Sequence, residues 1–162
     1  MRAVIQRVAQ ASVSGGGKTA SIGRGLCVFI GIAQEDSEED INLICRRITE
    51  LKLFPEETQV SETKESRGRW ARSVVDANGE ILLISQFTLH GVFKSNKSVS
   101  FHRSMAPDQA KIFFEKLHAT LQNSVPHPEA VKCCVFGSYM NVSVVNDGPV
   151  TILVDSKQPK GS

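Results

Sequence analysis

Two long apolar runs, at residues 26–32 and 80–89, limit most strongly how this chain can fold. The first run reads LCVFIGI and is apolar on both faces of an extended chain, so it predicts a central strand that is covered on both sides. The second is expected to be another strongly apolar strand. Neither run approaches the ~20 apolar residues that a membrane-spanning helix requires. We therefore expect a buried sheet in a water-soluble protein, with no membrane partner.

Other periodic patterns supply the rest of the fold. Alternating apolar positions predict strands at residues 1–14 and 19–22, on either side of three glycines, and further strands at 131–136, 139–146 and 150–155. Two apolar stripes at helical spacing predict one helix that begins near Asp36 or Ser37 and a second that Pro107 opens. Because most strands are joined by hairpin-type turns, the pattern indicates one α+β domain with antiparallel pairing. Residues 156–162 are expected to form a disordered tail.

Charge and cysteine content exclude several classes of protein. The 162 residues carry 19 Lys plus Arg against 17 Asp plus Glu, a formal charge of +2. This charge is too small for a strongly basic DNA-binding module, so no DNA partner is expected. The N-terminus enters a strand pattern without a signal peptide, which indicates an intracellular, cytoplasmic protein whose four cysteines remain thiols. No metal-ligand spacing is present, and we expect neither a metal nor another cofactor.

Familiar catalytic motifs are also missing from the sequence. There is no nucleophile elbow, no Walker motif and no zinc-protease motif, and the four histidines are scattered. The tetrad Ser85-Gln86-Phe87-Thr88 is the first segment of interest, since polar side chains interrupt an apolar strand on both faces. Buried polar groups cost about 1–3 kcal/mol unless they are paired, so such an interruption indicates either a functional site or a strand that runs out into solvent.

The second segment of interest reads NDGPVT and spans residues 146–151. An Asn-Asp-Gly-Pro sequence is ordinarily a turn. A Gly-Pro peptide can, however, also be cis at a cost of only about 0.5–1 kcal/mol, and a cis bond would place two carbonyl oxygens side by side as a rigid wall. The sequence alone leaves both interpretations open.

Four motifs together resemble the D-aminoacyl-tRNA deacylase family, also called the D-tyrosyl-tRNA deacylase family. They are MRAVIQRV at the N-terminus, SQFT at residues 85–88, FGSYM at 136–140 and NDGPVT at 146–151. The resemblance runs from residue 1 to about 155 and implies a single domain, residues 1–155, with a barrel-like sheet and two main helices. It also implies a homodimer that edits the 3′ end of aminoacyl-tRNA, hydrolysing D-aminoacyl esters and sparing L-aminoacyl esters. Glycyl-tRNA would also be a substrate, because a site that only excludes L side chains cannot exclude glycine.

The resemblance assigns roles to particular residues. The catalytic pocket would be lined by Ser85, Gln86, Phe87 and Thr88, whose main-chain N–H groups would bind the substrate carbonyl. Gly148 and Pro149 would form a cis dipeptide that reaches into the partner's pocket and excludes an L side chain, with Arg7 behind it. The remaining substrate-binding residues would be Asn146 and Thr151, together with Phe136, Gly137 and Met140, which would receive the terminal adenosine.

Several alternatives follow from the same residues. A pocket without a convincing base would work by orientation and an oxyanion-type site, with a tRNA ribose hydroxyl that places or activates water. Thr88 as an acyl-accepting nucleophile is the rival mechanism. Lys94, Lys97, Arg103 and the segment 67–72 would face phosphate groups or form an ordinary solvated surface, and residues 94–101 depart from the family pattern. The alternative function is a non-catalytic tRNA-binding module.

Overall fold

The computed structural model describes residues 1–56 and 70–158. Its two α-helices are α1 (Glu38–Glu50) and α2 (Pro107–Asn123), and its short 3-10 helices are η2 (Phe87–His90) and η3 (Pro128–Ala130). The strands are β1 (Arg2–Gly15), β2 (Lys18–Ile22), β3 (Gly25–Gly31), β4 (Glu80–Ser85), β5 (Val92–Phe93), β6 (Val99–Ser100), β7 (Val131–Cys133) and β8 (Met140–Asp155).

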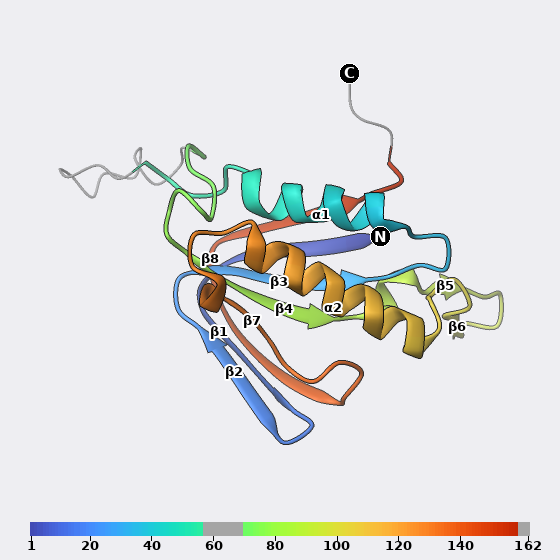
Figure 1. Cartoon of the computed structure of the whole chain (residues 1–162). Coiled ribbons are helices and arrows are strands. Elements are labelled where there is room, and N and C mark those ends of the chain that lie inside the picture. The colour runs from blue at the N-terminus through green and yellow to red at the C-terminus, as the bar shows by residue number, and fades with distance from the viewer. Residues whose placement is uncertain (57–69, 159–162) are drawn as a thin grey trace.

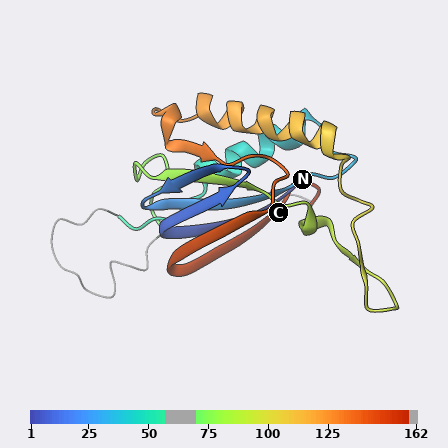
Figure 2. The ribbon, with the colours of Figure 1, turned by 90° about the horizontal axis from the view of Figure 1, so that it is seen from below.

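The main sheet is mixed and has the strand order β2-β1-β3-β4-β7, with β8 paired to β1. The long strand β1 pairs antiparallel with β3 through its first half and with β2 through its second half. Strand β8 follows almost its whole length on the other edge, and the sheet curls into a barrel-like shape (Figures 1 and 2). The prediction of an α+β, barrel-like sheet of mainly antiparallel strands is confirmed: β1 pairs antiparallel with β2, β3 and β8, whereas β3–β4 and β4–β7 are parallel.

Helices α1 and α2 lie together over one face of the sheet (Figures 1 and 2). Ile44 of α1 and Leu117 of α2 are fully buried in the larger core cluster, beside Val28 of β3. A smaller cluster on the other face takes Cys27 from the same strand, so β3 is covered on both sides, as its apolar run predicted. In residues 1–56 and 70–158, neither helix has the length and hydropathy of a membrane span.

Several predicted strands have different ends in the structure. Strand β4 ends at Ser85, and the chain turns into η2, so the expected alternation of side chains across residues 85–88 is wrong. The two strands expected at 139–146 and 150–155 are one strand, β8, which contains an irregularity in place of a turn. Both differences arise where the chain meets a distant strand, an influence that local periodicity does not record.

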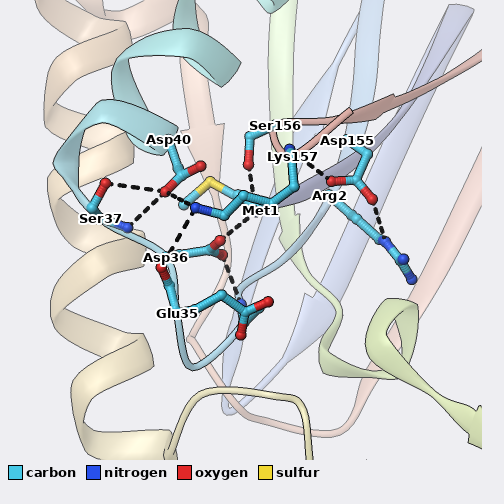
Figure 3. Close-up of polar contacts among 10 residues, drawn as sticks. Met1, Arg2, Glu35, Asp36, Ser37, Asp40, Asp155, Ser156 and Lys157 are labelled. Carbon is cyan, nitrogen blue, oxygen red and sulfur yellow. Dashed lines mark hydrogen bonds and ion pairs between the residues drawn. The ribbon is translucent and has the colours of Figure 1, made fainter. Parts of the chain in front are cut away.

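Residues 156–158 lie against the body of the protein. Ser156 accepts a hydrogen bond from the α-amino group of Met1 at 2.6 Å, and Lys157 Nζ donates to Asp40 Oδ2 at 2.8 Å (Figure 3). Asp40 also accepts from the Ser37 amide at 2.8 Å, which caps α1. Of the tail expected at 156–162, residues 159–162 lie outside the described residues, as do Arg67 and Arg69 of the 67–72 segment.

Candidate active site

Parallel pairing brings two distant segments of the chain to one edge of the sheet. Strands β4 and β7 are parallel neighbours, so the segments that follow them leave from the same edge. Ser85 ends β4, with Gln86 and Phe87 directly after it, whereas Phe136 and Gly137 follow β7. Ligand sites are commonly found where parallel strands end, and a pocket of about 590 Å³ lies at this edge.

This pocket contains six of the predicted site residues. They are Ser85, Gln86, Phe87, Phe136, Gly137 and Met140. Ile30 and Ile84 contribute apolar side chains from β3 and β4, and the first turn of α2 closes another side with Pro107 and Ala110. A mostly apolar lining with a few polar groups is typical of pockets for small organic ligands.

The tetrad at residues 85–88 is held by hydrogen bonds to neighbouring segments. The Gln86 amide donates to the Ile30 carbonyl at 2.8 Å, and Ser104 Oγ donates to the Phe87 carbonyl at 2.9 Å. The first N–H groups of a helix have no partner within that helix, and in η2 these belong to residues of the tetrad. The local structure thus gives the pocket wall a fixed backbone with amide donors.

Thr88 lies differently from the rest of the tetrad. It is exposed, it is not one of the residues that line the pocket, and its hydroxyl accepts a hydrogen bond from Gln86 Nε2. His90 follows in the same short helix but is buried. Within residues 1–56 and 70–158, no imidazole is hydrogen-bonded to Thr88.

A second group of predicted residues surrounds Arg7. Gln6 pairs with Thr151 and Val8 pairs with Asn146, so four residues of β8 lie opposite Arg7 alone. Arg7 is only 5% exposed, and its guanidinium donates to the Asp147 carbonyl at 3.1 Å and to the Leu53 carbonyl at 2.5 Å. It also forms an ion pair with the Asp147 carboxylate at 3.2 Å. This buried cation holds the irregular segment of β8 against β1.

Gly148 and Pro149 lie within that irregular segment, and the peptide bond between them is cis. Gly148 has a φ of 133°, which L side chains rarely adopt. A Cβ atom there would also be 2.9 Å from the amide nitrogen of Val150. Both the backbone conformation and the available space therefore require glycine at this position.

The two groups of predicted residues do not share one pocket within the chain. Arg7, Asn146, Gly148, Pro149 and Thr151 are not among the residues that line the pocket described above. Thr151 instead accepts a long hydrogen bond from Gln6 Nε2 at 3.5 Å. One chain thus carries a pocket and, separately, a rigid dipeptide held from behind by an arginine.

Sequence reasoning missed one wall of the pocket. Phe101, Ser104 and Met105 line it, and none of them was among the predicted site residues. The Phe101 ring packs edge-on against the Phe87 ring, with 5.0 Å between centroids and an interplanar angle of 79°. The sequence did offer one signal for this wall, because Phe101 is an aromatic residue in a mostly polar stretch of the chain.

We also searched the described residues for groups that could hold a metal ion and for reactive thiols. Within them, no group of three or more His, Cys, Asp or Glu side chains is placed to hold a metal ion. Burial raises the pKa of the Cys27 and Cys45 thiols to about 12, so neither is a ready nucleophile. The four cysteines are free.

The fold and the site define an α+β protein with a binding pocket at the edge of a curled mixed sheet. The family model described as "D-Tyr-tRNA(Tyr) deacylase" matches residues 4–155, and the chain belongs to this family. It is 42% identical over 160 residues to mouse D-aminoacyl-tRNA deacylase 1, covering 98% of this chain and 72% of the mouse protein. It is 40% identical over 161 residues to the D-aminoacyl-tRNA deacylase of Yarrowia lipolytica, covering 99% and 100%.

Two solved structures share this fold. A structure titled "c-Myc DNA Unwinding Element Binding Protein" has a TM-score of 0.86 and 41% identity, covering 98% of this chain and 100% of that one. A structure titled as a probable eukaryotic D-amino acid tRNA deacylase has a TM-score of 0.78 over 94% of this chain and 97% of that one. Its identity is 17%, so this second likeness concerns the fold alone.

Proposed function

We propose that this chain is a D-aminoacyl-tRNA deacylase, an editing esterase that hydrolyses D-aminoacyl-tRNA to a free D-amino acid and tRNA. Family membership supports the reaction class. The observation that carries the proposal is the pocket of about 590 Å³, which takes six predicted residues from two segments that lie about fifty residues apart in the sequence. An apolar pocket of this kind suits an amino-acid side chain joined to a nucleoside.

The working site is formed by two copies of the chain. Gly148 and Pro149 do not line their own chain's pocket, and they lie on β8, which within residues 1–56 and 70–158 pairs only with β1. This edge strand also exposes the apolar side chains of Val145 and Leu153. A second copy packed on β8 would cover these side chains and bring the dipeptide of each subunit to the pocket of the other.

Selection of the D-ester rests on this dipeptide. Arg7 is buried behind it and is bonded to the Asp147 carbonyl, so the segment has little freedom to move away from a substrate. A rigid backbone wall next to the substrate Cα would reject an L side chain by steric exclusion. Glycine has no side chain to reject, so the same site accepts glycyl-tRNA.

The chemistry needs no side-chain base. The main-chain N–H groups of Phe87 and Thr88, at the start of η2, bind the ester carbonyl and stabilise the oxyanion that develops on it. The terminal ribose hydroxyl of the tRNA positions or activates the attacking water. The exposed Thr88 hydroxyl, which has Gln86 as its neighbour and no imidazole, is a weaker candidate for the nucleophile.

Residues around the pocket would receive the 3′ end of the tRNA. Phe136, Gly137 and Met140 form one wall and receive the terminal adenosine. Lys94 and Lys97 stand at the tip of the β5–β6 hairpin, where the Lys94 amide donates to the Ser98 carbonyl at 2.9 Å. They suit phosphate groups of the same strand in a cytoplasmic enzyme that must sample many tRNAs and release them.

A non-catalytic tRNA-binding module is the second candidate. The two functions differ in turnover, so we would incubate D-tyrosyl-tRNA and glycyl-tRNA with one-hundredth of a molar equivalent of protein. The esterase predicts release of most of the amino acid from both substrates. Retention of tRNA with no release above the spontaneous rate would replace the proposed reaction by binding alone.

A further inference from the structure

Tyr139 is an unusual member of the pocket wall. It lines the pocket, yet its side chain is 91% exposed, so its ring stands at the mouth of the pocket and not inside it. In the part of the chain that the structure describes, its hydroxyl makes no hydrogen bond and its ring stacks on no other ring. None of the contacts among the described residues explains a large aromatic side chain at this point.

The backbone beneath Tyr139 is held in place. Ser138 Oγ donates to the Val135 carbonyl at 2.9 Å, and Met140 pairs with Gly15 of β1. The contact with β1 is so close that a Cβ atom on Gly15 would be 2.6 Å from the Tyr139 carbonyl oxygen. The backbone that carries the ring is therefore fixed, and ordering the ring on a ligand costs only the rotamer entropy of the side chain itself.

The pocket mouth carries other aromatic rings as well. Phe87 is exposed, and the Phe101 ring packs edge-on against it with 5.0 Å between centroids. Both residues line the same pocket as Tyr139. Exposed rings around one opening are typical of surfaces that bind single-stranded nucleic acid, because every base offers a face for stacking.

We infer that Tyr139 is a stacking platform for a second nucleobase, the one that precedes the terminal adenosine. This inference rests on the proposed function, which places the terminal adenosine against Phe136, Gly137 and Met140. Tyr139 lies between Gly137 and Met140 in the chain. The single-stranded 3′ end of a tRNA that leaves the pocket past this wall would therefore pass over the Tyr139 ring. Stacking reads no base edges, so the contact adds affinity for any tRNA that ends in a free single strand.

The test uses analogues with an amide in place of the ester. The first probe is 3′-(D-tyrosylamino)adenosine, the second adds a 5′-linked cytidylate, and the third replaces that cytosine by an abasic ribose phosphate. Binding to the wild-type protein and to Tyr139→Ala, Tyr139→Phe and Ile112→Ala is measured by calorimetry. Ile112 is an exposed apolar residue on α2 that does not line the pocket, and it serves as the matched control.

The wild-type protein is expected to bind the cytidylate probe about fivefold to tenfold more tightly than the abasic probe, a gain that reports stacking alone. Tyr139→Ala should lose this gain and keep its affinity for the adenosine probe, whereas Tyr139→Phe and Ile112→Ala should retain the gain. Equal binding of the cytidylate and abasic probes by the wild-type protein overturns the inference and leaves the proposed function standing. If the wild-type protein binds none of the three probes, both the inference about Tyr139 and the proposed function are overturned.

Discussion

At Gly148, the backbone conformation and the available space both require glycine, and their effects can be separated. A Cβ atom at Gly148 would meet the Val150 amide nitrogen at 2.9 Å, on a backbone with φ of 133°. Gly148→Ala should lower the free energy of unfolding by about 1–3 kcal/mol, as expected for strained backbone. Urea denaturation monitored by circular dichroism measures this loss.

Gly17→Ala is the matched control for this change. Gly17 also has a positive φ, of 76°, but a Cβ atom there would meet nothing within 4 Å. Gly17→Ala should therefore lower the free energy of unfolding only through the unfavourable backbone conformation, by about 1 kcal/mol. Equal losses at the two positions would show that the packing behind Gly148 contributes nothing.

Thr88 and the tRNA ribose make opposite predictions about the nucleophilic step. Among the described residues, the exposed Thr88 hydroxyl is hydrogen-bonded only to Gln86. Thr88→Ala should therefore lower the rate by at most about tenfold, a much smaller loss than the removal of a covalent nucleophile causes. D-Tyrosyl-tRNA that ends in 2′-deoxyadenosine should be nearly inert. Single-turnover deacylation measures both rates. An inactive Thr88→Ala with an active deoxy substrate would make Thr88 the nucleophile.

At the scale of the element, Asp40 joins the start of α1 to the end of β8. Burial would raise the pKa of its carboxyl, but hydrogen bonds from Lys157, Ser156 and Ser37 outweigh burial and hold that pKa below its ordinary value of 3.8. A carboxyl whose pKa is lower in the folded protein stabilises the fold above its ordinary pKa. This stabilisation is lost as the pH falls through the folded value.

Asp40→Asn should therefore destabilise the protein by about 1–2 kcal/mol at pH 7, from the weakened cap and the lost charge. The difference from wild type should shrink as the pH falls below 3.8, because only the wild-type carboxyl becomes protonated. Denaturation of both proteins between pH 7 and pH 2 measures this trend. A difference that stays constant across the range would show that the charge of Asp40 contributes no stability.

The same scale shows what the sequence could predict and what it could not. The apolar run at 26–32 predicted a doubly covered strand because local composition was sufficient, and β3 has that position. The turn at Ser85 depends on a hydrogen bond from Gln86 to Ile30, far away in the chain, and periodicity does not record it. The predicted pocket residues were identified by family resemblance. They lie together because β4 and β7 pair in parallel, which the sequence patterns did not indicate.

In the whole molecule, each pocket of the proposed enzyme needs residues from two subunits. Val145 and Leu153 are exposed apolar residues on β8, the strand that carries the dipeptide. Introducing Val145→Asp and Leu153→Asp together should shift the protein from dimer to monomer and abolish D-selective deacylation, because charge is costly to bury at an interface. Sedimentation velocity and an activity assay measure both effects. Ile112→Asp, on the exposed side of α2, should change neither, and a monomeric wild-type protein of full activity would refute the two-subunit site.

The proposed enzyme is a chiral editing esterase. Deacylation of matched D-tyrosyl-tRNA and L-tyrosyl-tRNA by the purified protein tests it most directly, under single-turnover conditions and with the same tRNA. We expect rapid release of D-tyrosine, while the L-ester decays at its spontaneous rate. Equal hydrolysis of the two esters would contradict chiral selection, and hydrolysis of neither would contradict the esterase itself.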